Sequence, residues 1–180
     1  MQLLRIYVSY VALAALVLGC ASNKSFEING GPLKSDPSVS EYLSGYIELL
    51  TSKDKTRSSN FNLGYKGTPE RHIWTIHFIY QGDVSLNTSY LELTLDGAQH
   101  RVELRGQPDV KDHSASGWQM ITEASSFDLS PEIANQLRSA QRVSMSLVGK
   151  TKKHSKDLET DQIDNIHSFF TQVDALTMGG

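Results

Sequence analysis

The chain has 180 residues, with 17 Lys and Arg against 20 Asp and Glu, and therefore a formal net charge of −3. A mildly acidic chain of this length fits one domain and lacks the basic character expected of a nucleic-acid-binding protein. A single cysteine excludes an internal disulfide framework and a metal site built from several thiolates.

The N-terminal segment has the parts of a secretory signal peptide. Arg5 precedes an apolar run at residues 6–19, and Cys20 directly follows the small residue Gly19. An apolar core of about 13 residues is well short of the ~20 needed to span a bilayer as a helix. The segment is therefore predicted to direct export.

The end of this run, Leu16-Val17-Leu18-Gly19-Cys20, resembles the lipobox of bacterial lipoproteins. The resemblance implies that residues 1–19 are a lipoprotein signal peptide and that Cys20 carries a covalent diacylglycerol and an acyl chain. Two or more chains hold a protein stably in a membrane. Two other interpretations remain open: an uncleaved N-terminal anchor helix, or a signal cut elsewhere that discards Cys20.

The residue after the cysteine bears on sorting. Among bacterial lipoproteins an aspartate there typically retains the protein at the inner membrane, whereas this chain has Ala21. If the host is Gram-negative, the resemblance then implies an outer-membrane lipoprotein facing the periplasm.

The start of the mature chain is predicted to be a flexible tether. Residues 20–37 hold few apolar side chains and two breaks, Asn29-Gly30-Gly31-Pro32 and Ser35-Asp36-Pro37. A single globular domain is expected over residues 38–176. It would begin with an amphipathic helix at residues 38–50, because apolar residues recur there at helical spacing, and continue with a polar loop at residues 51–60.

The centre of the domain is predicted to be β-structure. Residues 72–80 are apolar on both faces, which is typical of a central strand covered on both sides. Residues 90–95 and 100–105 alternate apolar and polar side chains around Asp96-Gly97, which predicts a hairpin. A loop at residues 106–116 and a strand at residues 118–127 follow.

The C-terminal part is predicted to be helix, strand and helix. Ser130-Pro131 has a typical N-cap serine and first-position proline. Residues 142–149 then alternate as a strand, a polar loop follows, and residues 160–175 carry an apolar stripe at helical spacing. Strands in the middle with helices at both ends predict an α+β domain, with an antiparallel sheet packed by helices on one side.

No catalytic or metal-binding motif is found. His72 and His77 would point to opposite faces of one strand and cannot share an ion. His100 would lie beside His77 only if their strands were neighbours. His113 stands near two aspartates in a predicted loop. No serine lies in a nucleophile elbow or a Ser-x-x-Lys box. Glu123 and Asp128 form a carboxylate pair only if a cleft unites them. We therefore expect no catalytic residues, no metal and no further cofactor.

One cluster of positive charge stands out: Lys150, Lys152, Lys153 and Lys156. Such a cluster contributes ~1 kcal/mol per residue at an anionic lipid surface, although a solvated loop is the favoured interpretation.

The sequence thus predicts a membrane-anchored envelope lipoprotein with a non-catalytic binding or assembly domain and an envelope protein as its partner. Two alternatives stay open: a hydrolase acting on glycan or lipid, and a carrier of a small apolar ligand.

Overall fold

A computed structural model describes residues 26–51, 57–115, 119–150 and 152–178. The signal peptide, Cys20 and the first residues of the predicted tether lie outside them. The described elements, in chain order, are β1 (Ile28–Pro32), β2 (Ser40–Ser44), β3 (Ile47–Thr51), β4 (Ser58–Gly67), β5 (His72–Gly82), β6 (Thr88–Leu95), β7 (Ala98–Glu103), β8 (Asp109–Asp112), β9 (Ile121–Leu129), α2 (Pro131–Ser139), β10 (Val143–Gly149), β11 (Lys153–Asp157) and α3 (Thr160–Met178).

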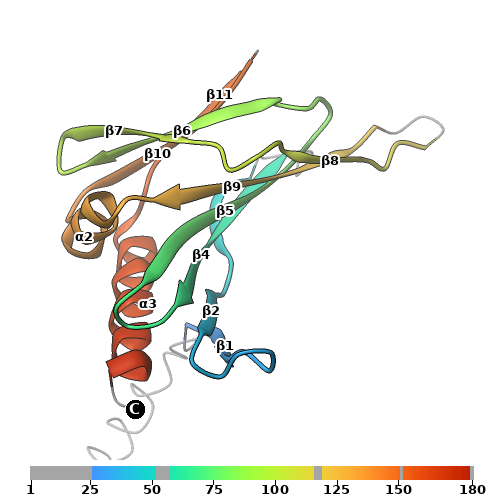
Figure 1. Cartoon of the computed structure of the whole chain (residues 1–180). Helices are drawn as coiled ribbons and strands as arrows, with labels where there is room; N and C mark the ends of the chain where they lie inside the picture. The colour runs from blue at the N-terminus through green and yellow to red at the C-terminus, as the bar shows by residue number, and fades with distance from the viewer. Residues whose placement is uncertain (1–25, 52–56, 116–118, 151, 179–180) are drawn as a thin grey trace, which may run out of the picture.

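The strands form two antiparallel sheets. Sheet A has the order β1-β2-β4-β5-β9-β8, with β3 also paired to β4, and sheet B has the order β11-β10-β6-β7. In Figure 1 sheet B lies above sheet A, and α2 and α3 lie together on one side of sheet A. The two sheets are joined where Leu104 bridges to Phe127 and the Arg105 amide donates to the Ser126 carbonyl at 2.8 Å. The α+β prediction is confirmed, with two sheets in place of one.

A single apolar core fills the space between the sheets and under α3. One face of sheet A contributes alternate residues of β4, β5 and β9, which are buried against sheet B and the helices. The largest of these side chains are Phe61, Phe78, Tyr80 and Phe127. One turn of α3 adds Phe169 and Phe170, which contact the Trp74 ring at centroid distances of 6.0 and 4.5 Å. We call this buried face of sheet A the inner face and the opposite one the outer face.

The elements with strong local signals form as predicted. β6 and β7 make the expected hairpin, whose turn residues Asp96 and Gly97 adopt φ angles of 50° and 95°. Ser130 caps α2 by accepting a hydrogen bond from the Ile133 amide at 3.2 Å. β5, β9, β10 and α3 are also confirmed within a few residues of their predicted ends.

The helix predicted at residues 38–50 is wrong, because this segment forms β2 and β3 on the edge of β4. Two residues of the supposed apolar stripe, Leu43 and Tyr46, are 37% and 64% exposed. Gly45 and the β-favouring Tyr, Ile and Thr side chains oppose a helix, and pairing with β4 satisfies the backbone instead.

The tether predicted up to residue 37 is also corrected. β1 pairs with β2 from Ile28↔Ser44 to Pro32↔Ser40, so the folded body includes residues that precede the expected boundary. Gly30, one of the two glycines that suggested a flexible break, is used for close approach, since a Cβ there would lie 2.0 Å from the Glu41 carbonyl oxygen.

Two further expectations differ from the structure. β5 is central, between β4 and β9, but Ile73 on its outer face is 46% exposed, so this end of the strand is covered on one side only. β8 and β11 occupy segments predicted as loops, and most of β4 was not predicted at all. β8 and β11 are short edge strands rich in polar residues, whose pairing partners lie elsewhere in the chain.

Candidate functional site

A cleft of about 580 Å³ lies where the β4–β5 hairpin meets the start of α2 and the last turns of α3. The hairpin contributes an apolar and aromatic wall that includes Tyr65, Ile73 and Trp74. The opposite wall comes from α2 and α3, with Asn135, Arg138 and Asp174. Cavities of ~300–1,000 Å³ with mostly apolar walls and a few polar groups are typical of small-molecule sites.

The aromatic wall is held together by ring contacts. The Tyr65 ring lies 4.9 Å from the Trp74 ring and 5.2 Å from the His72 ring, measured between centroids. The Tyr65 hydroxyl donates to the Thr68 carbonyl at 3.0 Å, which fixes the turn of the hairpin. Burial, the Tyr42 hydroxyl and the Asp174 carboxylate raise the pKa of Tyr65, so this phenol stays neutral. These ring contacts and the Tyr65 hydrogen bond therefore hold the aromatic wall together.

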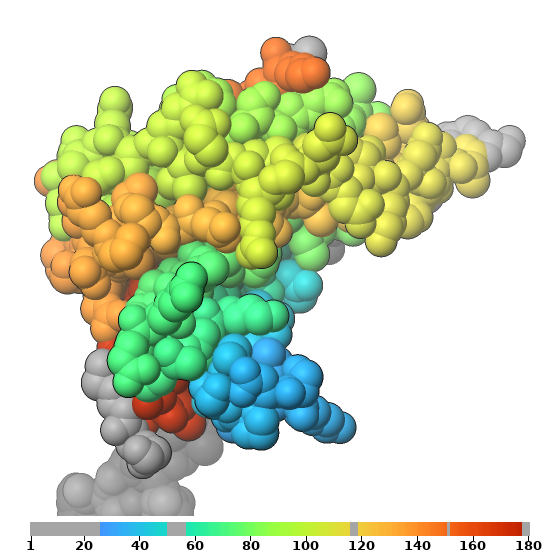
Figure 2. All heavy atoms as spheres, viewed as in Figure 1, coloured from blue at the N-terminus to red at the C-terminus, as the bar shows by residue number. Residues whose placement is uncertain are grey.

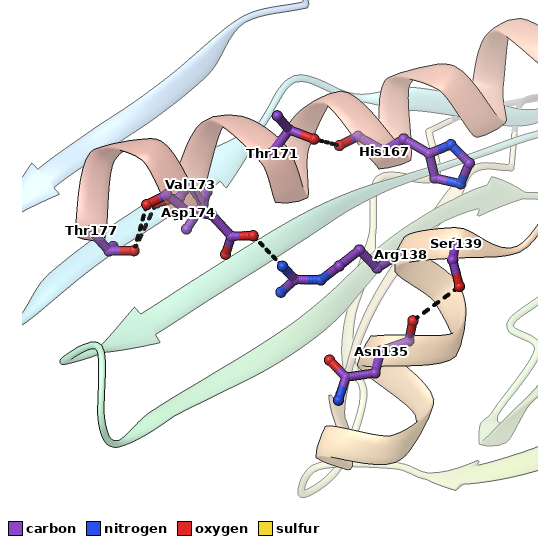
Figure 3. Close-up of polar contacts among 8 residues, drawn as sticks. All are labelled: Asn135, Arg138, Ser139, His167, Thr171, Val173, Asp174 and Thr177. Carbon is purple, nitrogen blue, oxygen red and sulfur yellow. Dashed lines mark hydrogen bonds and ion pairs between the residues drawn. The ribbon is translucent and has the colours of Figure 1, made fainter. Parts of the chain in front are cut away.

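Arg138 connects the two helices across the cleft (Figure 3). Its guanidinium pairs with the Asp174 carboxylate and lies 5.6 Å from the centroid of Trp74 and 5.0 Å from that of Phe170. Within the described chain, its Nε–H has no hydrogen-bond partner. His167 of α3 adds a second link, with Nε2 at 3.1 Å from the Ala140 carbonyl at the end of α2. The cleft is thus lined by one guanidinium, whose Nε is itself buried, and it has a firmly held frame.

Glu123 and Asp128, the two carboxylates considered from the sequence, do not form a pair in the structure. Glu123 faces the inner side of β9 and is 1% exposed, whereas Asp128 lies on the outer side and pairs with Arg105 at 3.3 Å. Two side chains that are five positions apart on a strand lie on opposite faces of the sheet. The two carboxylates therefore cannot flank one substrate bond.

Glu123 instead has a structural role. Its Oε2 accepts from the Ser85 hydroxyl at 2.6 Å and the Asn87 amide at 3.0 Å, and its Oε1 accepts from the Thr88 amide at 2.7 Å. Burial opposes the charge on Glu123, but the hydrogen bonds from Ser85, Thr88 and Asn87 outweigh it and lower the pKa. The charged carboxylate thereby holds the connection between β5 and β6.

A second polar cluster lies on the outer face of sheet A, around His77. Its Nδ1 is 2.8 Å from the Ser126 hydroxyl and its Nε2 is 2.9 Å from the Thr75 hydroxyl. Burial and the nearby Arg105 lower the pKa of His77, so the ring is neutral near pH 7. Gly64 makes room for it, since a Cβ there would lie 2.3 Å from Thr75 Oγ1 and 3.0 Å from His77 Nε2. No sequence motif marks this cluster, because its residues come from separate strand positions.

The other histidines do not gather. His72 lies on the same strand as His77 but lines the cleft, and His100 lies in sheet B, away from His77 in sheet A. Across the described ranges, no three His, Cys, Asp or Glu side chains are close enough together to hold a metal ion.

The four lysines lie in and beside the β10–β11 hairpin, which we call the lysine hairpin. Lys153 pairs with Glu92 of β6, and Lys156 pairs with Glu159 at 3.3 Å. The Lys153–Glu92 pair reaches from β11 across β10 to β6. The Lys156–Glu159 pair joins β11 to the residue that precedes α3. Acidic side chains therefore pair with two of the four lysines, Lys153 and Lys156, in the folded protein.

Comparison with known proteins adds no further assignment. No family model, curated protein or solved structure matches the chain. Neither helix in the described part of the chain is long and apolar enough to cross a bilayer. The functional argument therefore depends on the chain's own residues.

Proposed function

We propose that the chain is a lipoprotein of the cell envelope, anchored through Cys20, whose single domain is a non-catalytic binding module. The lipobox-like segment supports the anchor. The observation that carries the binding role is the cleft between the β4–β5 hairpin, α2 and α3, with its aromatic wall, Asn135 and the guanidinium of Arg138.

The cleft suits binding better than catalysis. Its two carboxylates, Asp128 and Asp174, are each held in an ion pair with an arginine, so neither is directed at a bound substrate as a general acid would be. A ligand with an apolar body and one hydrogen-bond acceptor would contact Ile73 and Trp74 and accept from Arg138. Because the cleft opens to solvent, it supports a module that holds part of a larger partner more than a carrier that encloses an apolar molecule.

The anchor is tested by metabolic labelling. Wild-type protein should incorporate labelled palmitate and move with the membranes, whereas the Cys20→Ser variant should do neither. Equal incorporation by both would exclude Cys20 as the lipidation site.

The cleft is tested by filling it. Asn135 is exposed and lines the cleft, so Asn135→Tyr should block ligands without disturbing the core. Ser139→Tyr, four residues further along α2 and outside the cleft, is the matched control. In an NMR screen of small amphiphilic fragments, hits should perturb the Trp74 indole signal in wild type and the control but not in Asn135→Tyr. Hits that persist in Asn135→Tyr would place binding elsewhere.

A second candidate function is an envelope hydrolase, and the specific observation is the contact between Ser126 and His77. A neutral imidazole within hydrogen-bond distance of a hydroxyl is the arrangement that activates a serine. No carboxylate orients the ring, since its other nitrogen meets Thr75. Covalent labelling by a fluorophosphonate probe that Ser126→Ala abolishes would favour this alternative, and an unlabelled wild-type protein would eliminate it.

A further inference from the structure

The folded body begins close to the proposed lipid anchor. Phe26 and Ile28 pack against the core, and β1 pairs with β2 from Ile28 onward. Only residues 21–25 separate Phe26 from Cys20. At ~3.3–3.6 Å per residue, even a fully extended connection spans at most about 20 Å. A lipidated Cys20 would therefore hold this edge of sheet A near the headgroups.

An exposed aromatic side chain lies at the point where the chain enters the body. The Gly45 amide donates to the Glu27 carbonyl at 2.8 Å, which fixes the β2–β3 turn beside the first residues of the body. The next residue, Tyr46, is 64% exposed. A tyrosine with an apolar ring and a polar tip is suited to the boundary between headgroups and acyl chains.

The charges around this turn indicate which headgroups fit. Glu27 and Glu48, on either side of Tyr46, are exposed carboxylates. Both would be repelled by an anionic surface, whereas zwitterionic headgroups offer ammonium groups to carboxylates and an interface to the ring.

We infer that, in the anchored protein, β1 and the β2–β3 turn rest on a zwitterionic membrane surface with Tyr46 as the contact. The inference depends on the proposed lipidation of Cys20.

This contact also sets the orientation of the domain. β8, at the other end of sheet A, is five strand spacings from β1, about 24 Å at ~4.8 Å per spacing. In Figures 1 and 2 the hairpin of β8 and β9 projects away from the segment that holds β1. That hairpin would therefore point toward the periplasm.

The test uses single cysteines in the full-length lipidated protein. Cys20 is the sole natural cysteine and is blocked when lipidated, so one new cysteine takes a fluorophore at one site. The positions are Tyr46→Cys at the predicted contact, Val110→Cys on β8 and Ser155→Cys on the lysine hairpin. All three residues are exposed, so the substitutions should leave the fold intact.

The labelled proteins are reconstituted into phosphatidylcholine vesicles that contain a headgroup-quencher lipid. Quenching at position 46 should be at least threefold stronger than at positions 110 and 155. Equal quenching at the three positions, or strongest quenching at 155, would overturn the inference.

Flotation of the same samples separates failure of this inference from failure of the proposed function. Protein that fails to float with the vesicles overturns both, because the anchor is then absent. Protein that floats but shows no preference for position 46 retains the anchor and overturns only the orientation.

A longer tether provides the matched control. Insertion of a flexible Gly-Ser segment of about 20 residues after Ala21 raises the r.m.s. span of the connection to ~25–30 Å, which frees the domain from the surface. Quenching at position 46 should then fall to the level at position 110. Unchanged quenching would overturn the part of the inference that depends on the short connection.

Discussion

Glu123→Gln should destabilise the domain by about 2–4 kcal/mol, because this substitution replaces one carboxylate oxygen by a donor. In the structure three donors meet the carboxylate: the Ser85 hydroxyl and the Asn87 and Thr88 amides. Whichever way the amide turns, at least one of these donors faces an NH₂ group. One unsatisfied buried donor costs ~1–3 kcal/mol, and the surviving bonds lose their charge-assisted strength.

The effect should depend on pH. Since the hydrogen bonds lower the pKa of Glu123 in the folded state, protonation favours the unfolded chain. The stabilisation is complete above the ordinary glutamate pKa of ~4.3 and is lost as the pH falls through the lower folded-state pKa. Glutamine does not titrate, so the gap in unfolding free energy between wild type and Glu123→Gln should narrow in acid.

Urea melts of a soluble form that begins at Ala21, recorded from about pH 7 to about pH 3, measure both effects. Glu92→Gln is the control: this half-buried side chain on β6 forms one surface ion pair with Lys153, so its replacement should change the unfolding free energy by less than ~1 kcal/mol. A loss for Glu123→Gln as small as that of the control, or one that does not narrow in acid, would refute the structural role of the charge.

Three other predictions follow from packing and charge. Leu93→Ala should cost ~2–5 kcal/mol in urea melts, because Leu93 is fully buried between the sheets, and a loss no larger than that of Glu92→Ala would contradict its place in the core. Arg138→Met keeps an apolar stem but loses the partly buried ion pair with Asp174 and the contact over Trp74, so it should lower the free energy of unfolding by about 1–2 kcal/mol. Unchanged stability would mean that the link between the helices is dispensable. The soluble form should not bind anionic vesicles at physiological salt, because half of the lysine hairpin is already paired; salt-sensitive binding that is lost when its four lysines become Gln would overturn this.

The elements that the sequence predicts correctly have signals contained within a few residues. Asp96-Gly97 specifies its own turn, and Ser130-Pro131 specifies the start of its own helix. β5 is a run of β-branched and aromatic residues, which predicts a strand before its partners are known. In each case the local preference agrees with the tertiary structure, as expected for a sequence with little conflict between the two.

The errors arise where pairing between distant segments decides the structure. Residues 38–50 fit a helical spacing by coincidence, and pairing with β4, whose partner residues lie 7–27 positions further along the chain, makes this segment β2 and β3. β4 itself had a usable signal, since Phe61, Leu63 and Tyr65 alternate with polar or small residues. β1, β8 and β11 had none, because a short polar edge strand resembles a loop until its partner is known.

The candidate cleft was beyond prediction for the same reason. Its walls combine residues from Tyr65 to Thr177, which only the packing of α2 and α3 against the β4–β5 hairpin brings together. The Ser126–His77 contact likewise depends on the register between β5 and β9. Neither the cleft nor the Ser126–His77 contact follows a fixed spacing along the chain, so no sequence motif predicts it.

The edges of the two sheets have a consequence for crowding. β8 and β11 carry charges of both signs, β7 ends in an exposed Arg and Glu, and β1 contains two glycines and a proline that lacks an amide donor. Exposed edges of this composition resist pairing with other strands. If Cys20 is lipidated as proposed, copies of the domain share one plane and meet often. Edges of this kind would then protect them against edge-to-edge aggregation at densities where a flat apolar edge would begin a fibril.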